Sequence, residues 1–224
     1  MEQGNLCGPP LLGTLPVPIA LEPQEFKNKI GSGAIVLDTR DPSSFGGAHI
    51  AEAYSIWLDG LPSFAGWVLS YDKPLVLVVD DEQHLEKAVR YLVREGFDNI
   101  AGYLKGNIES WYNAGLPIES LKLISANDLK SMLDRKEDIT VLDVRKQNEW
   151  DAGHIEGAVH IFVGHLVDKI SQIPREKATV VHCSAGYRSG LAASILLRAG
   201  YVKVYNVAGG INVWISSGLP IMQG

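Results

Sequence analysis

Cys183 is the residue of this chain best placed to do chemistry. It follows an apolar run, 179–182, and precedes a short polar loop that opens an amphipathic stretch. This order predicts a strand, a loop and a helix. Backbone N–H groups of such a loop, together with the positive end of the helix, bind anions, and Arg188 adds a fixed positive charge. These surroundings favour the thiolate form of a cysteine, so Cys183 is predicted to be a nucleophile.

The segment from Cys183 to Ser189 resembles the active-site loop of rhodanese sulfurtransferases, in which the cysteine carries a transferred sulfur atom as a persulfide. It is also similar to the signature of cysteine phosphatases, where His-Cys precedes a glycine-containing loop closed by Arg-Ser. Four residues separate Cys183 from Arg188, whereas the phosphatases have one more. A tighter loop suits a reacting sulfur better than a bulkier phosphoryl group, so the spacing favours sulfur transfer.

The resemblance implies that Cys183 is catalytic and that the following loop binds the substrate. The candidate binding residues are Ser184, Ala185, Gly186, Tyr187, Arg188 and Ser189. Arg145 is a further candidate, which would orient an anionic substrate from beside the site. His182 is predicted to be structural, because adjacent residues on a strand point to opposite faces. The alternative to a catalytic role is that Cys183 is a buried, unreactive residue of the core.

The chain repeats itself after about residue 20. The paired segments are Val36–Arg40 with Val141–Arg145, Ala48–Ile50 with Gly153–Ile155, and Gly115–Ile118 with Gly218–Ile221. The repeat predicts two domains of ordinary size, 21–118 and 119–224. Residues 1–20 are rich in proline and glycine and are predicted to form an extended linker or arm.

Each copy is expected to be an α/β domain. Short apolar runs alternate with stretches of helical spacing, and such runs are typical of strands buried in a mainly parallel sheet. The helical stretches end before Gly96 and Gly200, which suit C-terminal caps. The rhodanese resemblance extends to Leu142–Arg145, Glu149-Trp150, Gly153–Ala158 and Ala208–Ile211 with Trp214. It implies two tandem domains, each with a five-stranded, mainly parallel sheet flanked by helices.

The first domain is predicted to be catalytically inactive. An uninterrupted alignment of the two copies places Val79 opposite Cys183, and sliding by one residue places Asp80 there. Neither alignment supplies a thiol. His49 and Arg40 persist in this inactive copy, so their counterparts in the second copy are predicted to be mainly structural. The carboxylates 80–82 are more consistent with the start of a helix than with a metal site.

Aromatic residues gather in the middle of the first domain. They are Trp57, Phe64, Trp67 and Tyr71. Their simplest role is packing in the core or between the domains, and a further expectation is that they wall the pocket of the second domain.

Composition narrows the class of protein. The chain has 224 residues and a net charge of −6, which argues against nucleic acid or an anionic membrane surface as the main partner. Its two cysteines, Cys7 and Cys183, do not suggest a disulfide framework. We see no export signal and no membrane-spanning stretch, so a cytoplasmic location is expected.

The expected function is sulfur transfer. The donor would be thiosulfate or a low-molecular-weight persulfide such as glutathione persulfide, and a thiol, sulfite or cyanide would accept the sulfur. No metal or organic cofactor is required. The arm also resembles the segment before the rhodanese modules of metallo-β-lactamase-fold persulfide dioxygenase fusions, which suggests such a dioxygenase as a partner. The alternatives are a cysteine phosphatase or arsenate reductase, and a non-catalytic sulfur-carrier or interaction module.

Overall fold

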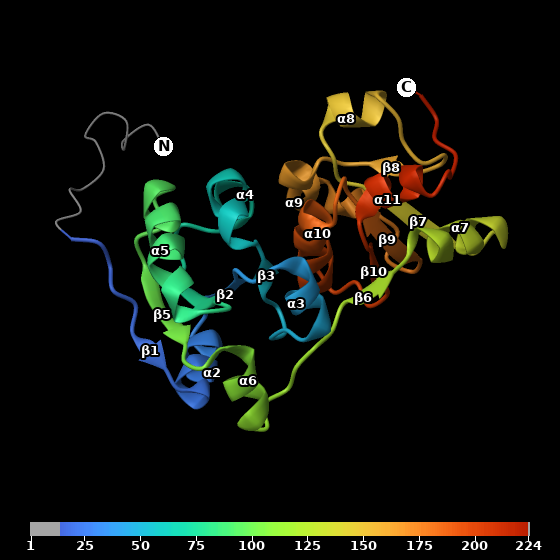
Figure 1. Ribbon diagram of the computed structural model, residues 1–224. Coiled ribbons are helices and arrows are strands. Elements are labelled where there is room, and N and C mark those ends of the chain that lie inside the picture. Colours follow the sequence, from blue (N-terminus) through green and yellow to red (C-terminus); the bar gives the residue numbers. More distant parts are fainter. Residues whose placement is uncertain (1–13, 224) are drawn as a thin grey trace.

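The computed structural model describes residues 14–223, which form two lobes of similar construction (Figure 1). The first lobe contains β1 (Ala20–Leu21), α2 (Pro23–Gly31), β2 (Ile35–Asp38), α3 (Pro42–Gly47), β3 (Tyr54–Ser55), α4 (Leu61–Val68), β4 (Leu75–Val78), α5 (Leu85–Arg94), β5 (Ile100–Leu104) and α6 (Asn107–Asn113). The second contains β6 (Lys122–Ile124), α7 (Ala126–Asp134), β7 (Ile139–Asp143), α8 (Gln147–Asp151), β8 (Val159–His160), α9 (Leu166–Lys169), β9 (Ala178–His182), α10 (Tyr187–Arg198), β10 (Val204–Val207) and α11 (Gly210–Ser216).

Each lobe is built on a five-stranded parallel sheet. The strand order is β1-β5-β4-β2-β3 in the first lobe and β6-β10-β9-β7-β8 in the second. The two orders correspond position by position, as an internal repeat requires. Helices cover the sheets, so the predicted α/β class with two tandem sheets is confirmed. The catalytic candidate follows β9, the middle strand of its sheet, at the carboxyl end where ligands of parallel sheets bind.

Glycine ends the two corresponding helices, as the sequence predicts. Gly96 follows α5 with a φ of 85°, and Gly200 follows α10 with a φ of 86°. Their N–H groups donate to Val93 O at 3.0 Å and to Leu197 O at 2.9 Å. A residue in the left-handed region lets the last helical carbonyls find donors, and glycine adopts it without steric cost.

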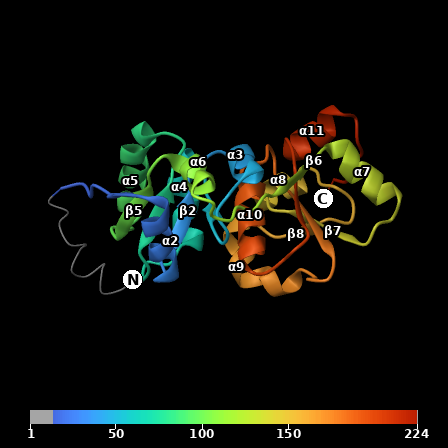
Figure 2. The ribbon, with the colours of Figure 1, turned by 90° about the horizontal axis from the view of Figure 1, so that it is seen from below.

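The lobes are packed against each other through α10, which lies at their junction (Figures 1 and 2). Every residue from 189 to 196 of this helix is buried. The backbone N–H of Ser55 in β3 donates to Ser194 Oγ at 3.1 Å. An added Cβ on Gly190 would lie 2.9 Å from the Pro42 side chain, so the glycine permits close approach of α3. The helix that follows the candidate site is therefore enclosed by both lobes.

Part of the predicted arm lies outside the described residues. Residues 1–13, with Cys7, belong to this part, and the first strand begins at Ala20. Within the described range, no helix is long and apolar enough to cross a membrane.

Candidate active site

Cys183 lies at the base of a loop, with its side chain buried and two donors close to the sulfur. The backbone N–H of Gly186 is 3.1 Å from Cys183 Sγ, and the Ser189 hydroxyl is 3.5 Å from it. Gly186 has a φ of 106° and precedes the first residue of α10, so the loop turns sharply there. Hydrogen bonds from these donors and the positive helix end stabilise negative charge on sulfur.

The amino end of α11 holds the other side of the loop. The N–H of Ile211 donates to Cys183 O at 2.8 Å, and the N–H of Asn212 donates to Ser184 O at 3.1 Å. In trans peptides the C=O and N–H point in opposite directions, so the N–H groups of Ser184 and Ala185 point away from α11. An added Cβ on Gly210 would lie 2.2 Å from Cys183 O. This explains the glycine directly before Ile211, and an added Cβ on Gly209 would meet the Val213 side chain at 2.1 Å.

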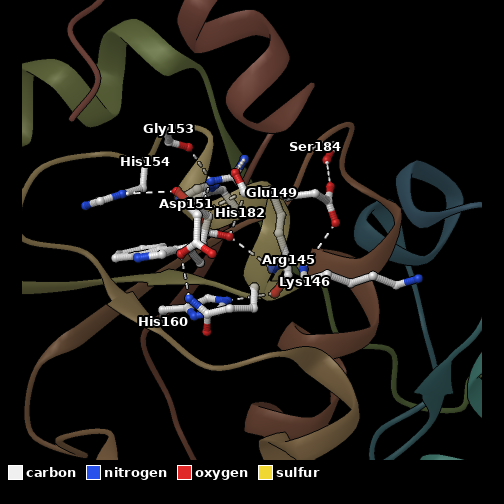
Figure 3. A network of polar contacts seen from close by, with 12 residues as sticks. Arg145, Lys146, Glu149, Asp151, Gly153, His154, His160, His182 and Ser184 are labelled. Carbon is white, nitrogen blue, oxygen red and sulfur yellow. Dashed lines mark hydrogen bonds and ion pairs between the residues drawn. The ribbon is translucent and has the colours of Figure 1, made fainter. Parts of the chain in front are cut away.

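Arg188 is held in a bidentate ion pair with Glu149 of α8. Its two terminal nitrogens lie 2.6 Å and 2.8 Å from the carboxylate oxygens. Ser184 completes the network, because its hydroxyl donates to Glu149 at 2.7 Å and accepts from Arg188 at 2.8 Å. Figure 3 shows the Glu149 carboxylate directed toward Ser184. The Arg188 guanidinium lowers the Glu149 pKa to about 2, so the carboxylate is charged and neutralises the arginine.

Arg145 is bound within the protein, in line with the mainly structural role predicted from its counterpart Arg40 and not with the alternative that it orients a substrate. The residue is only 4% exposed, and its guanidinium binds both carboxylate oxygens of Asp143. It also donates to the backbone carbonyls of Glu149 and Gly153, at 3.0 Å and 2.8 Å (Figure 3). Arg40 pairs with Asp38 in the same way in the first lobe. Arg145 therefore fixes the loop after β7, and it does not line the cavity beside Cys183.

The histidines near the site have structural environments. His182 is fully buried, and burial lowers its pKa, which keeps the ring neutral. His154 stacks on Trp150 with 3.7 Å between ring centres, and His160 contacts the same indole at 4.8 Å. The Nδ1 atom of His154 lies 3.2 Å from Trp150 O. Hydrogen bonds to the sulfur come from Gly186 and Ser189 rather than from an imidazole.

A cavity of about 560 Å³ opens beside Cys183, and both lobes line it. Trp57 and Phe64 come from the first lobe, whereas Tyr187 and Arg188 come from the second. The Trp57 and Tyr187 rings are 5.1 Å apart, so this contact bridges the lobes at the mouth of the loop. The first lobe thus supplies an aromatic wall of the cavity.

Comparison with known proteins identifies the family. The sequence pattern of the rhodanese-like domain family matches residues 22–114 and again residues 125–217, which together make up most of the chain. This chain belongs to the rhodanese-like family. A sulfurtransferase of Allochromatium vinosum is 33% identical over 99 residues, which cover 44% of this chain and 92% of that protein. The thiosulfate sulfurtransferase GlpE of Coxiella burnetii is 33% identical over 82 residues, covering 37% of this chain and 77% of that protein. The putative sulfur carrier protein YrkF of Bacillus subtilis is 33% identical over 110 residues, which cover 49% of this chain and 57% of that protein.

The two rhodanese-like lobes differ at the active-site loop. Asp38 pairs with Val78 in the first sheet, and Asp143 pairs with His182 in the second. This register places Val79 at the position of Cys183, so the structure selects the uninterrupted alignment. The side chain of Asp81 then accepts from the backbone N–H of Gln83 at 2.9 Å. Asp81 caps the short helical turn Glu82–His84, and the described residues contain no cluster that suits a metal ion.

Glu149 is the site residue that sequence reasoning missed. It belongs to the Glu149-Trp150 segment of the rhodanese resemblance, which by itself indicates no role for it. The repeat contains a signal for it, because the constant spacing that pairs Val36 with Val141 also pairs Ser44 with Glu149. In the first copy the counterparts of Arg188 and Glu149 are therefore His84 and Ser44. Both members of the ion pair are missing together with the cysteine, which indicates that they belong to the same site.

Proposed function

We propose that this protein is a sulfurtransferase in which Cys183 carries sulfane sulfur as a persulfide. The observation that supports this best is the placement of Cys183 Sγ beside the Gly186 N–H and the Ser189 hydroxyl, at the end of a cavity that can admit a donor. Family membership and the names of the similar sulfurtransferases point in the same direction. The reaction requires no metal or organic cofactor.

The first half-reaction loads the cysteine. The Cys183 thiolate attacks the outer sulfur of thiosulfate, a new S–S bond forms, and the bond between the two thiosulfate sulfurs breaks. Its electron pair leaves with sulfite. The transferred sulfur then lies above the loop, where the N–H groups of Ser184 and Ala185 point away from α11 and are candidates to bind it. With a persulfide donor the leaving group is the parent thiolate.

The second half-reaction unloads the cysteine. A thiophile such as cyanide, sulfite, glutathione or a protein thiol attacks the outer sulfur, and the electron pair of the broken S–S bond restores the Cys183 thiolate. Tyr187 is exposed at the cavity mouth and would line the path of the acceptor. Because Glu149 neutralises Arg188, this arginine would hold the loop and contribute only part of its charge to an anionic donor. Two sequential displacements predict ping-pong kinetics.

A persulfide dioxygenase remains a proposed partner, and a cytoplasmic location a proposed setting. In that arrangement the protein would supply persulfide to the dioxygenase or remove it. Co-purification of the two proteins, or transfer of sulfur between them without release, is the test.

Intact-protein mass spectrometry tests the chemistry directly. After brief incubation with thiosulfate or glutathione persulfide, we expect the wild-type protein to gain the mass of one sulfur atom, and cyanide or sulfite to reverse the gain. Cys183→Ser should gain nothing. If neither donor adds sulfur, the proposal is wrong, and hydrolysis of a chromogenic phosphate ester that depends on Cys183 would favour a phosphatase instead.

A further inference from the structure

A second cavity adjoins the one that contains Cys183. Its volume is about 730 Å³, and Phe64 and Lys146 line both cavities. Shared lining residues mean that the two cavities lie side by side, so an extended ligand in one would reach the other across Phe64 and Lys146. Thiosulfate has only a handful of heavy atoms and would occupy a small part of this space, which is within the range of pockets that bind much larger molecules. We call the second cavity the tail groove.

The tail groove is positively charged although the protein is acidic. Its positive charge comes from Lys146 and Lys169, and its lining contains no carboxylate among the described residues. Neither lysine forms an ion pair with a described residue, unlike Lys87, Lys105, Lys130 and Lys177 elsewhere in the described range. Figure 3 shows the Lys146 side chain extending away from the Arg145 network. Unpaired cations in a concave site attract an anionic ligand.

Aromatic side chains from both lobes form the apolar part of the groove. Trp67 of the first lobe is 50% exposed, and its ring lies edge to face with Phe162 at 5.9 Å and with His165 at 5.3 Å. An added Cβ on Gly164 would lie 2.8 Å from the Trp67 ring, so this contact depends on a glycine. The groove therefore exists only while the two lobes are docked. An exposed tryptophan beside free cations suits an organic anion better than an inorganic one.

We propose, building on the sulfurtransferase function, that the tail groove binds the anionic tail of a low-molecular-weight persulfide whose outer sulfur reaches Cys183. The ligand class is a thiol with at least two anionic groups several atoms from the sulfur. Glutathione supplies these as carboxylates, and coenzyme A supplies them as phosphates. In the transfer, the Cys183 thiolate bonds to the outer sulfur, which keeps its proton, and the parent thiol leaves as its thiolate.

The test compares donors with and without an anionic tail. The variants are Lys169→Glu and Trp67→Ala, which change residues of the tail groove that do not line the cavity of Cys183. Lys203→Glu is the matched control, because it makes the same charge change outside both cavities. The donors are glutathione persulfide, coenzyme A persulfide, the persulfide of 2-mercaptoethanol, and thiosulfate.

We expect Lys169→Glu to lower kcat/KM for one or both anionic persulfides about fivefold to tenfold, mainly through KM, as for reversal of a partly exposed charge. The anionic donor that shows the larger loss of kcat/KM identifies carboxylate or phosphate as the chemistry of the tail. Thiosulfate and 2-mercaptoethanol persulfide should react within about twofold of wild type, since ordinary surface changes have small effects. Equal losses with all donors, no loss in either variant, or the same loss in Lys203→Glu would overturn the proposal.

A binding measurement separates this proposal from the function on which it rests. Calorimetry of wild type and Lys169→Glu with S-methylglutathione and with S-methyl coenzyme A requires no sulfur transfer. Weaker binding of either ligand to the variant supports the groove even if Cys183 proves unreactive. Conversely, loading of Cys183 by thiosulfate, together with no binding of either ligand to wild type, leaves the sulfurtransferase function standing and refutes the tail groove.

Discussion

Substitution of Glu149 by glutamine is the sharpest test of how the active-site loop is held. The change removes the negative charge and keeps an oxygen that can accept from Arg188 and Ser184. In the wild type the Arg188 guanidinium, with help from the Ser184 hydroxyl, lowers the Glu149 pKa from 4.5 to about 2. At roughly 1.36 kcal/mol for each pKa unit, this shift sets an upper limit of about 3 kcal/mol on the contribution of the carboxylate to stability.

Solvent screening makes the actual contribution of the ion pair to stability smaller than this upper limit. The Arg188 and Glu149 side chains are 17% and 29% exposed, so water screens the pair in part. We therefore expect Glu149→Gln to lower the free energy of unfolding by about 1–2 kcal/mol at neutral pH. Because the Glu149 pKa is lower in the folded chain than in the unfolded chain, this contribution is complete above the unfolded pKa of 4.5 and is lost as the pH falls toward 2.

Urea unfolding of wild type and Glu149→Gln at several pH values measures this difference. The control is Glu137→Gln, which breaks a more exposed pair with Arg135 and should cost no more than about 0.5 kcal/mol. In kinetic assays, Glu149→Gln leaves the charge of Arg188 unbalanced beside the site, and we expect KM for thiosulfate to fall about twofold to fivefold. Equal destabilisation by both substitutions, or a pH-independent difference, would refute the reasoning.

Two further predictions follow from the packing around β9. Gly210→Ala should lower the rate of persulfide formation about a hundredfold, because its Cβ would displace Cys183 O. Gly218→Ala is the control, since Gly218 has a similar φ of 71° and no atom lies within 4 Å of the added Cβ. Equal losses of rate in the two variants would contradict the steric argument. His182 has a pKa lowered by burial, so the unfolded chain binds the proton more readily and stability should fall as the pH drops below about 6.5. Thermal unfolding between about pH 7.5 and 5.5 should show a shallower decline in His182→Gln, and an unchanged slope would contradict this assignment.

Much of the fold could be predicted from the sequence because its signals are local. The apolar runs at 35–37, 75–79, 141–144 and 179–182 coincide with β2, β4, β7 and β9. Glycines stop both corresponding helices, since only the backbone next to them decides whether a helix continues. The internal repeat added a comparison within one chain, and the strand register places Val79 opposite Cys183, as the uninterrupted alignment of that repeat predicts.

The partners of Arg145 and Arg188 could not be decided from local sequence patterns. The sequence predicts a mainly structural role for Arg145, from its counterpart Arg40, and an anion-binding role for Arg188, but it names no carboxylate partner for Arg188. The structure separates them, since Arg145 is buried on Asp143 while Arg188 reaches Glu149, a residue 39 positions away in the chain. Which carboxylate a guanidinium meets depends on how β7, α8 and α10 pack, and no local pattern encodes that distance.

The sequence by itself therefore determined the two α/β repeats, the cysteine-containing loop in the second, and the absence of a thiol from the corresponding position in the first. The sequence left open whether the first-domain aromatics pack in the core or wall the second domain's pocket. The tertiary structure decided that Trp57 and Phe64 reach the cavity of Cys183 and that Trp67 lies over the second lobe. Hydrophobic periodicity and turn residues determine helices, strands and turns through the neighbouring backbone, so the sequence of one segment is enough to predict these elements. The shared cavity depends instead on complementary surfaces of two domains, which exist only after both have folded and docked.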